Sequence, residues 1–150
     1  MLGSAIVNNF DHGISAVDAV YAGRHSHSAI HIVAAGDQAA IIDTGTHYSI
    51  PALIEALAQQ GVTPEQVAYV IVTHVHLDHA GAAGALLAVC PHARLVVHPK
   101  GARHLIDPAK LIAGSIAVYG EALFHELYGD ILAAPAERVI EAGDGHQIDF

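Results

Sequence analysis

A histidine-rich turn between an apolar strand and a small-residue helix constrains this chain more than any other feature. Residues 67–73 (VAYVIVT) are almost wholly apolar and β-branched, which predicts a strand buried on both faces. Residues 74–81 (HVHLDHAG) follow directly, and the small apolar residues 82–89 after them predict a buried helix. The turn therefore lies at the carboxyl end of a strand, where open α/β sheets place their ligands.

Four side chains in this turn are candidate metal ligands: His74, His76, Asp78 and His79. In an extended segment His74 and His76 point to the same side, because side chains alternate across a strand. Asp78 and His79 fall where the chain bends into the helix, so they can turn toward a second ion. Burying these polar groups without an ion would cost free energy, so we expect metal here. The alternative is that they are ordinary polar residues at a strand end.

The remaining sequence alternates between strand and helix patterns. Before the turn we expect strands at 14–22, 29–35 and 39–43, a hairpin turn at Gly36-Asp37, and an amphipathic helix at 50–60 that stops at Gly61. After the turn we expect a strand at 93–98, helices within 100–128 broken at Asp107-Pro108, and a hairpin formed by 139–141 and 147–150. This order predicts an α/β fold, at the border with α+β, in which helices pack on a mixed β-sheet.

Composition narrows the classes of protein to consider. The 150 residues predict a single domain over 1–150, and 53% hydrophobic with 14% charged residues excludes intrinsic disorder. Six Lys and Arg against 15 Asp and Glu give a net charge of −9, which argues against nucleic-acid and membrane-surface partners. Without a signal peptide or a long apolar run, we expect a cytoplasmic protein. We expect Cys90, the only cysteine, to be a buried, inert thiol.

The turn also carries a family resemblance. Residues 74–81, preceded by Thr73 and the apolar strand, resemble the signature of the metallo-β-lactamase-fold superfamily, and Asp43-Thr44-Gly45 is similar to its D-x-G turn. The resemblance extends over about 14–150 and implies the amino-terminal half of the family's αββα sandwich. The motif is specific for the superfamily but does not choose among thioesterases, lactonases, β-lactamases, nucleases and diiron proteins.

The resemblance implies a binuclear centre. His74 and His76 would bind the first ion and Asp78 and His79 the second, while Asp78 also contacts the metal-held water and Asp43 supports the loop. Two divalent ions, zinc as first choice and iron as second, would hold a hydroxide that attacks a carbonyl carbon. The implied activity is hydrolysis of a small-molecule ester, thioester or lactone, as in glyoxalase II-like enzymes and lactonases.

Several alternatives stay open. The family completes its site from the carboxyl-terminal half, and this sequence has no later signature of that kind. Either the chain is a truncated part of a longer protein, or a homodimer or a partner chain completes the sandwich. The alternative function is a diiron protein that handles oxygen or nitric oxide, since imidazole and carboxylate also accept iron. A nuclease of the same fold and a metal-free interaction module rank below it.

Ten of the 13 histidines lie outside the motif. His98 and His104 follow the strand next to the motif strand, so they are candidates to line the site. His27 and His31 would share one face of a strand. For the others we expect ordinary polar surroundings.

Overall fold

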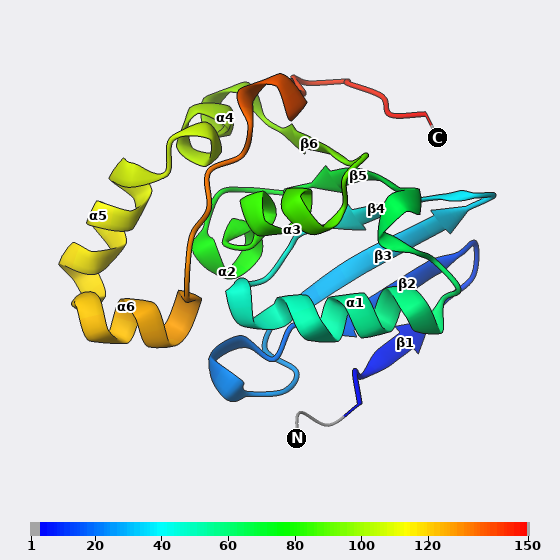
Figure 1. Cartoon of the computed structure of the whole chain (residues 1–150), viewed down its shortest axis with the longest axis horizontal. Helices are drawn as coiled ribbons and strands as arrows, with labels where there is room; N and C mark the ends of the chain where they lie inside the picture. Colours follow the sequence, from blue (N-terminus) through cyan, green and yellow to red (C-terminus); the bar gives the residue numbers. More distant parts are fainter. Residues whose placement is uncertain (1–3, 150) are drawn as a thin grey trace.

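A seven-stranded mixed sheet forms the centre of the computed structural model, which describes residues 4–149 (Figure 1). Its strands lie side by side in chain order: β1 (Val7–Asn9), β2 (Ile14–Asp18), β3 (Ala29–Ala35), β4 (Gln38–Ile42), β5 (Val67–Ile71), β6 (Arg94–Val97) and β7 (Val139–Glu141). The first four strands pair antiparallel, and β4 to β7 pair parallel. The predicted α/β class with a mixed sheet is therefore confirmed.

Helices α1 and α3 cover one face of the sheet (Figure 1). The α-helices of the described residues are α1 (Ile50–Gln59), α2 (Leu77–Ala80), α3 (Ala83–Val89), α4 (Pro99–Ile106), α5 (Ala109–Tyr119) and α6 (Glu121–Tyr128). Single 3-10 turns occur at Tyr21–Gly23, His47–Ser49, Pro64–Gln66 and Ala136–Arg138. The main core lies between the sheet and helices α1, α3 and α4. Its fully buried side chains include Ile30, Ile41, Val70, Leu53 and Leu86.

The helix predicted at 50–60 forms as α1. Pro51 lies in its first turn, where a missing N–H removes no intrahelical hydrogen bond. Leu53 and Leu57, four residues apart, are fully buried against the sheet. Gly61 follows the helix with a φ of 71°, a conformation that glycine adopts without a steric penalty.

The other face of the sheet is only half-buried. Ile42 is paired with Ile71 across β4 and β5, and both side chains are partly exposed on this face, as are Val33 and Ile140. The expectation that residues 67–73 are buried on both faces is therefore wrong for the described structure. Val67 and Val70 point into the helix-covered core, whereas Ile71 points away from it.

Two strand boundaries near the amino terminus differ from the sequence prediction. The strand expected at 14–22 ends at Asp18, because Val20 and Ala22 adopt left-handed backbone conformations with φ of 50° and 53°. The Asp18 carboxylate accepts the N–H of Val20 at 2.9 Å, which holds the chain in this turn. Strand β1 was not predicted, since its three residues include only one strong strand former, Val7.

The predicted carboxyl-terminal hairpin does not form in the described residues. Val139 and Ile140 pair in parallel with β6, and the N–H of Ala142 extends this pairing to the carbonyl of Val97 at 2.8 Å. A turn follows, but residues 147–149 form no strand, and Phe150 lies outside the described residues. Residues 139–140 instead extend the parallel part of the sheet beside β6.

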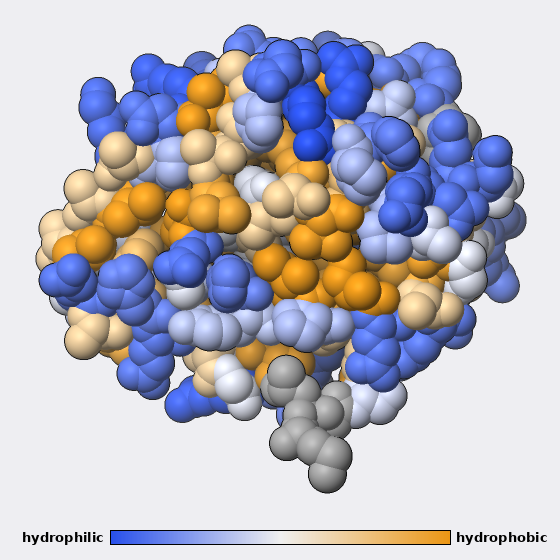
Figure 2. Space-filling view, in the orientation of Figure 1, coloured by the Kyte–Doolittle hydropathy of each residue, from blue (hydrophilic) through white to orange (hydrophobic). Residues whose placement is uncertain are grey.

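Helices α5 and α6 form an arm at one end of the molecule. The predicted break at Asp107-Pro108 separates α4 from α5, and Gly120, with a φ of 80°, separates α5 from α6. The arm exposes apolar side chains, with Val118 75% exposed (Figure 2). Among the helices of residues 4–149, none has both the length and the apolar character needed to cross a bilayer.

Candidate metal centre

Parallel pairing of β4 and β5 brings two distant segments to one edge of the sheet. Asp43 directly follows β4, and the turn 73–79 follows β5. Ile42 lies opposite Ile71, and the N–H of Asp43 donates to the carbonyl of Ile71 at 2.7 Å. The Asp43 side chain is therefore fixed directly behind the histidine-rich turn.

The Asp43 carboxylate is surrounded by donors. Oδ1 accepts the backbone N–H of Thr73 at 2.8 Å and its hydroxyl at 2.9 Å. Oδ2 accepts Nδ1–H of His79 at 2.9 Å. Asp43 is 7% exposed and has a φ of 60°, a conformation that Asp tolerates better than most residues. Asp43 thus supports the turn from behind, as the family resemblance implies.

This network directs the second nitrogen of His79 outward. Because a carboxylate only accepts hydrogen bonds, Nδ1 is the donor to Asp43, and Nε2 is the ring nitrogen directed away from it. That Nε2 lies 3.4 Å from Oδ2 of Asp78. The Asp78 carboxylate and the His79 ring are therefore direct neighbours in the described structure. Both are side chains that would hold a divalent ion if one is bound here.

Thr73 extends the same network to His74. Its hydroxyl oxygen lies 3.0 Å from Nδ1 of His74. Since the single hydroxyl proton is directed to Asp43, the oxygen accepts Nδ1–H of His74, which leaves Nε2 of that ring free. One buried carboxylate thus sets the tautomer of His79 directly and that of His74 through Thr73.

The three imidazoles of the motif are neighbours on the surface. The ring of His74 lies 4.8 Å from that of His76 and 4.4 Å from that of His79, measured between centroids. His74 and His76 are exposed, and the side chains of Asp78 and His79 are 33% and 29% exposed. Within residues 4–149, no three His, Cys, Asp or Glu side chains converge tightly enough to hold an ion. The four candidate ligands are therefore neighbours in the described structure without forming a complete three-ligand group.

Thr44 also stabilises the turn, although sequence analysis gave it no role. Its N–H donates to the carbonyl of His79 at 2.6 Å, and its hydroxyl donates to that carbonyl at 3.0 Å. The hydroxyl oxygen of Thr44 also accepts the N–H of Ala82 at 3.1 Å. The sequence feature that could have indicated these supporting roles is shared by Thr44 and Thr73. Both carry hydroxyl groups at the carboxyl ends of neighbouring parallel strands.

Leu77 connects the motif to the α5–α6 arm. Its side chain is buried with Phe124 and Tyr128 of α6, in a cluster separate from the main core. The hydroxyl of Tyr21 donates to that of Tyr128 at 3.3 Å. Burial of Tyr128, together with its hydrogen bonds to Tyr21 and Tyr119, raises the pKa of its phenol well above the usual value. The loop after β2 and helix α6 therefore meet beside the motif.

The other candidate histidines lie in different surroundings. Nδ1 of His98 accepts the N–H of Lys100 at 3.2 Å and so caps α4, while Nε2 of His104 accepts Nε–H of Arg103 at 3.3 Å. His31 is exposed on the half-buried face opposite Ile42, and His27 lines a hollow with Asp18. Cys90 is buried as expected, and burial raises the pKa of its thiol to about 11.

Comparisons with known proteins support this assignment of the fold. The chain is 47% identical over 57 residues to metallo-beta-lactamase domain-containing protein 1 of Mus musculus, which covers 38% of this chain and 20% of that protein. It is 26% identical over 116 residues to putative diflavin flavoprotein A 2 of Nostoc sp., which covers 77% of this chain and 17% of that protein. The chain thus spans about a fifth of these relatives.

Solved structures show the same architecture. A HARLDQ-motif mutant of a metallo-beta-lactamase from Cronobacter sakazakii matches with a TM-score of 0.68 and 20% identity, over 96% of this chain and 50% of that one. A B3 metallo-beta-lactamase with an active-site glutamic acid matches with a TM-score of 0.69 and 18% identity, over 95% and 47% of the two chains. The family model of the metallo-beta-lactamase superfamily matches residues 22–147. The chain therefore belongs to the metallo-beta-lactamase superfamily.

Proposed function

We propose that this chain supplies one half of a binuclear centre that hydrolyses a small ester, thioester or lactone. The observation that carries the proposal is the shared support of His79 and His74 by the Asp43 carboxylate, directly and through Thr73. Metal-binding histidines typically donate their second N–H to such a carboxylate or hydroxyl, which fixes the tautomer and orients the ring. The donor set of imidazoles and one carboxylate fits divalent zinc, and also iron.

In this proposal the residues of the turn bind two different metal ions. His74 and His76 hold one ion, and Asp78 and His79 hold the other. Divalent ions in such a site lower the pKa of water and polarise a carbonyl group. The side chain of Asp78 is 33% exposed, so its carboxylate can also accept a proton from a water at the mouth of the site. Asp43 and Thr73 engage the Nδ1 atoms of His79 and His74, so that Nε2 of each ring is the nitrogen that faces the proposed metal.

The chain spans 50% of the length of the Cronobacter sakazakii enzyme. We propose that the remaining ligands and the substrate contacts come either from a longer chain or from a second copy or partner chain. No Lys or Arg occurs between Thr73 and Pro91, so the turn and its helix offer no cationic side chain to a phosphodiester. We propose a substrate whose reacting group is neutral, rather than a phosphodiester.

Hydrolysis of a thioester by the zinc-loaded protein tests this function. Release of free thiol is followed in the native protein and in Asp78→Asn, with Asp144→Asn in the exposed turn as the matched control. We expect Asp78→Asn to lose at least about a hundredfold in kcat/KM, since it removes a metal ligand and a proton acceptor together. The proposed activity is ruled out if the zinc-loaded protein, assayed together with the part or second copy that completes the centre, cleaves no ester, thioester or lactone.

A diiron oxygen- or nitric-oxide-handling protein is the second candidate. The match to the putative diflavin flavoprotein of Nostoc sp. over 77% of this chain favours it. Its test is reconstitution with ferrous iron under anaerobic conditions, followed by exposure to oxygen. A visible absorption band with reversible oxygen uptake would favour this function, and a colourless protein active only with zinc would exclude it.

A further inference from the structure

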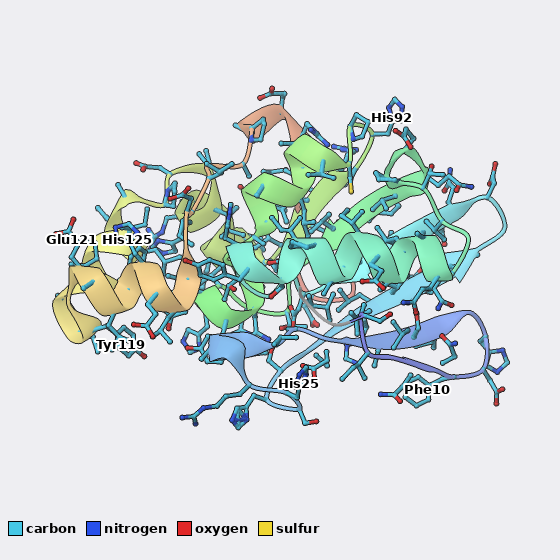
Figure 3. All side chains as sticks on the ribbon, turned by 60° about the horizontal axis from the view of Figure 1, so that its bottom comes forward. Phe10, His25, His92, Tyr119, Glu121 and His125 are labelled. Atoms are coloured by element: carbon cyan, nitrogen blue, oxygen red, sulfur yellow. The ribbon has the colours of Figure 1, made fainter. Side chains whose placement is uncertain are left out.

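A cavity of about 750 Å3 lies apart from the histidine-rich turn. It is open to solvent and is lined by residues 4–6, the loop 20–25, the first half of α1 and the last turn of α6, which meet on one side of α1 (Figure 1). His25, at its edge, projects from that loop (Figure 3). The motif residues 74–79 do not line the cavity. Its volume is within the range of small-molecule sites in proteins, about 300–1,000 Å3.

The lining combines apolar walls with acidic groups. Ile6, Val20 and Leu127 supply apolar surface from three different segments. Glu55 and Glu126 contribute carboxylates, and the described lining contains no Lys or Arg. The chain also carries a net charge of −9. An apolar ligand with a positive charge therefore complements this cavity, whereas an anion does not.

The two carboxylates have different roles. Glu55 is already occupied, because Oε1 accepts the hydroxyl of Ser4 at 2.8 Å and Oε2 accepts the N–H of Ala5 at 3.1 Å. These bonds hold the amino-terminal segment against α1 and form one wall. Glu126 makes no side-chain hydrogen bond or ion pair with any other residue in 4–149. Glu126 is therefore the carboxylate that remains free to pair with a ligand.

The opposite wall is a strained loop. Val20 has φ 50° and ψ 42°, and Ala22 has φ 53° and ψ 31°. Both conformations are left-handed, and this is especially unusual for Val20, which is β-branched. The buried Asp18 carboxylate holds the loop by accepting the N–H groups of Val20 and Ser26, at 2.9 and 3.1 Å. Strained backbone that the surrounding structure holds in place is concentrated at ligand sites. The wall is thus formed before a ligand arrives.

We propose that this cavity binds a small organic cation, an ammonium group on an apolar body. The ammonium pairs with the carboxylate of Glu126, and Tyr48, which lines the same cavity, is the aromatic side chain available to the same charge. The apolar body packs against Ile6, Val20 and Leu127. This site is independent of the proposed hydrolysis, since it shares no residue with the motif.

Calorimetric titration with three matched probes tests the site. 2-Phenylethylamine is the cation, 2-phenylethanol its neutral analogue, and phenylacetate the anion. We expect the amine to bind most tightly and phenylacetate not to bind. In Glu126→Gln the affinity for the amine falls about fivefold, as for a partly exposed charge pair, while that for the alcohol is unchanged. Glu121→Gln lies on the same helix but outside the cavity, so we expect it to leave the affinities for all three probes unchanged.

A second variant tests the position of the site. Ala52→Trp fills the cavity and abolishes binding of both amine and alcohol, whereas Ala58→Trp, exposed on the same helix outside the lining, does not. Circular dichroism and the Tm of each variant confirm that it is folded, and excess EDTA separates this site from the motif. The proposal is overturned if the amine does not bind, if phenylacetate binds as well, if Glu126→Gln binds the amine normally, or if Ala52→Trp retains binding.

Discussion

The imidazole of His79 donates from Nδ1 to Oδ2 of Asp43 at 2.9 Å, although the two residues are 36 positions apart in the sequence. The contact exists because β4 and β5 are parallel neighbours whose carboxyl ends lie at the same edge. It makes one buried carboxylate responsible for the orientation of the turn on which the proposed function depends.

Replacing Asp43 by Asn should weaken metal binding without removing a ligand. Thr73 and His79 donate to different oxygens of Asp43, and Asn replaces one of these oxygens with an NH2 donor, so one of the two hydrogen bonds is lost. We expect the zinc Kd, measured by competition with a chelator, to rise by about ten- to a hundredfold. Asp37→Asn, in the exposed β3–β4 turn, is the control, and an unchanged Kd in Asp43→Asn would show that the carboxylate does not orient the ligands.

Thr73 should act through its hydroxyl rather than its shape. Thr73→Val keeps the volume but removes the bridge between Asp43 and His74, whereas Thr73→Ser keeps the hydroxyl. We expect the zinc Kd to rise about tenfold in the Val variant and to stay near the native value in the Ser variant. Equal losses in both variants would instead indicate that the methyl group matters.

Arg138 should stabilise the fold at a distance from the motif. Its guanidinium donates to the carbonyls of Leu87 at 2.7 Å, Cys90 at 2.7 Å and Ala93 at 2.6 and 2.9 Å, which closes the end of α3. Arg138→Lys keeps the charge but cannot reach three carbonyls, so the free energy of unfolding should fall by about 2 kcal/mol.

Urea denaturation measures this change, with Arg94→Lys, exposed on β6, as the matched control. A loss in Arg138→Lys no larger than in Arg94→Lys would mean that the fork of hydrogen bonds contributes little.

Asp18 should make stability depend on pH in the acid range. Burial tends to raise the pKa of its carboxyl, but the N–H groups of Val20 and Ser26 and the ring of His25 outweigh this and lower it. A lowered pKa in the folded state stabilises the protein above the usual carboxyl pKa of about 4, and the contribution is lost as the pH falls through the folded value. Asp18→Asn should therefore unfold more easily than the native protein at pH 7.

At pH 7 we expect a difference of about 1 kcal/mol in the free energy of unfolding, and a much smaller one under strongly acidic conditions. Urea titrations of both proteins at each pH, with Asp144→Asn as control, measure it. A difference that is constant over the whole pH range would show that the charge of Asp18 is not what holds the loop.

Sequence patterns predicted the elements whose signals are local. The helix at 50–59 follows from Pro51, the buried pair Leu53 and Leu57, and the stop at Gly61. The β3–β4 hairpin follows from Gly36-Asp37, with Gly36 at a φ of 60°. The position of the motif after β5 was also predicted, because an apolar β-branched run is a strong strand signal.

What depends on long-range pairing could not be predicted. The role of Thr73 requires the parallel register that places Asp43 beside it, and a single sequence does not specify that register. The pairing of Val139 and Ile140 with β6, in place of a hairpin, depends in the same way on an edge strand available in space. The cavity beside α1 joins residues as distant as Ile6 and Leu127, so no sequence pattern indicates it.

Whether the histidine-rich turn binds metal is tested most directly by the zinc content of the protein after equilibration and gel filtration. This measurement depends on the turn and does not depend on the substrate. The matched variants are His79→Ala in the motif and His92→Ala, an exposed histidine outside it. We expect bound zinc in the native protein and in His92→Ala, and its loss in His79→Ala. Equal zinc content in His79→Ala and His92→Ala, or no retained zinc in the native protein, would contradict it.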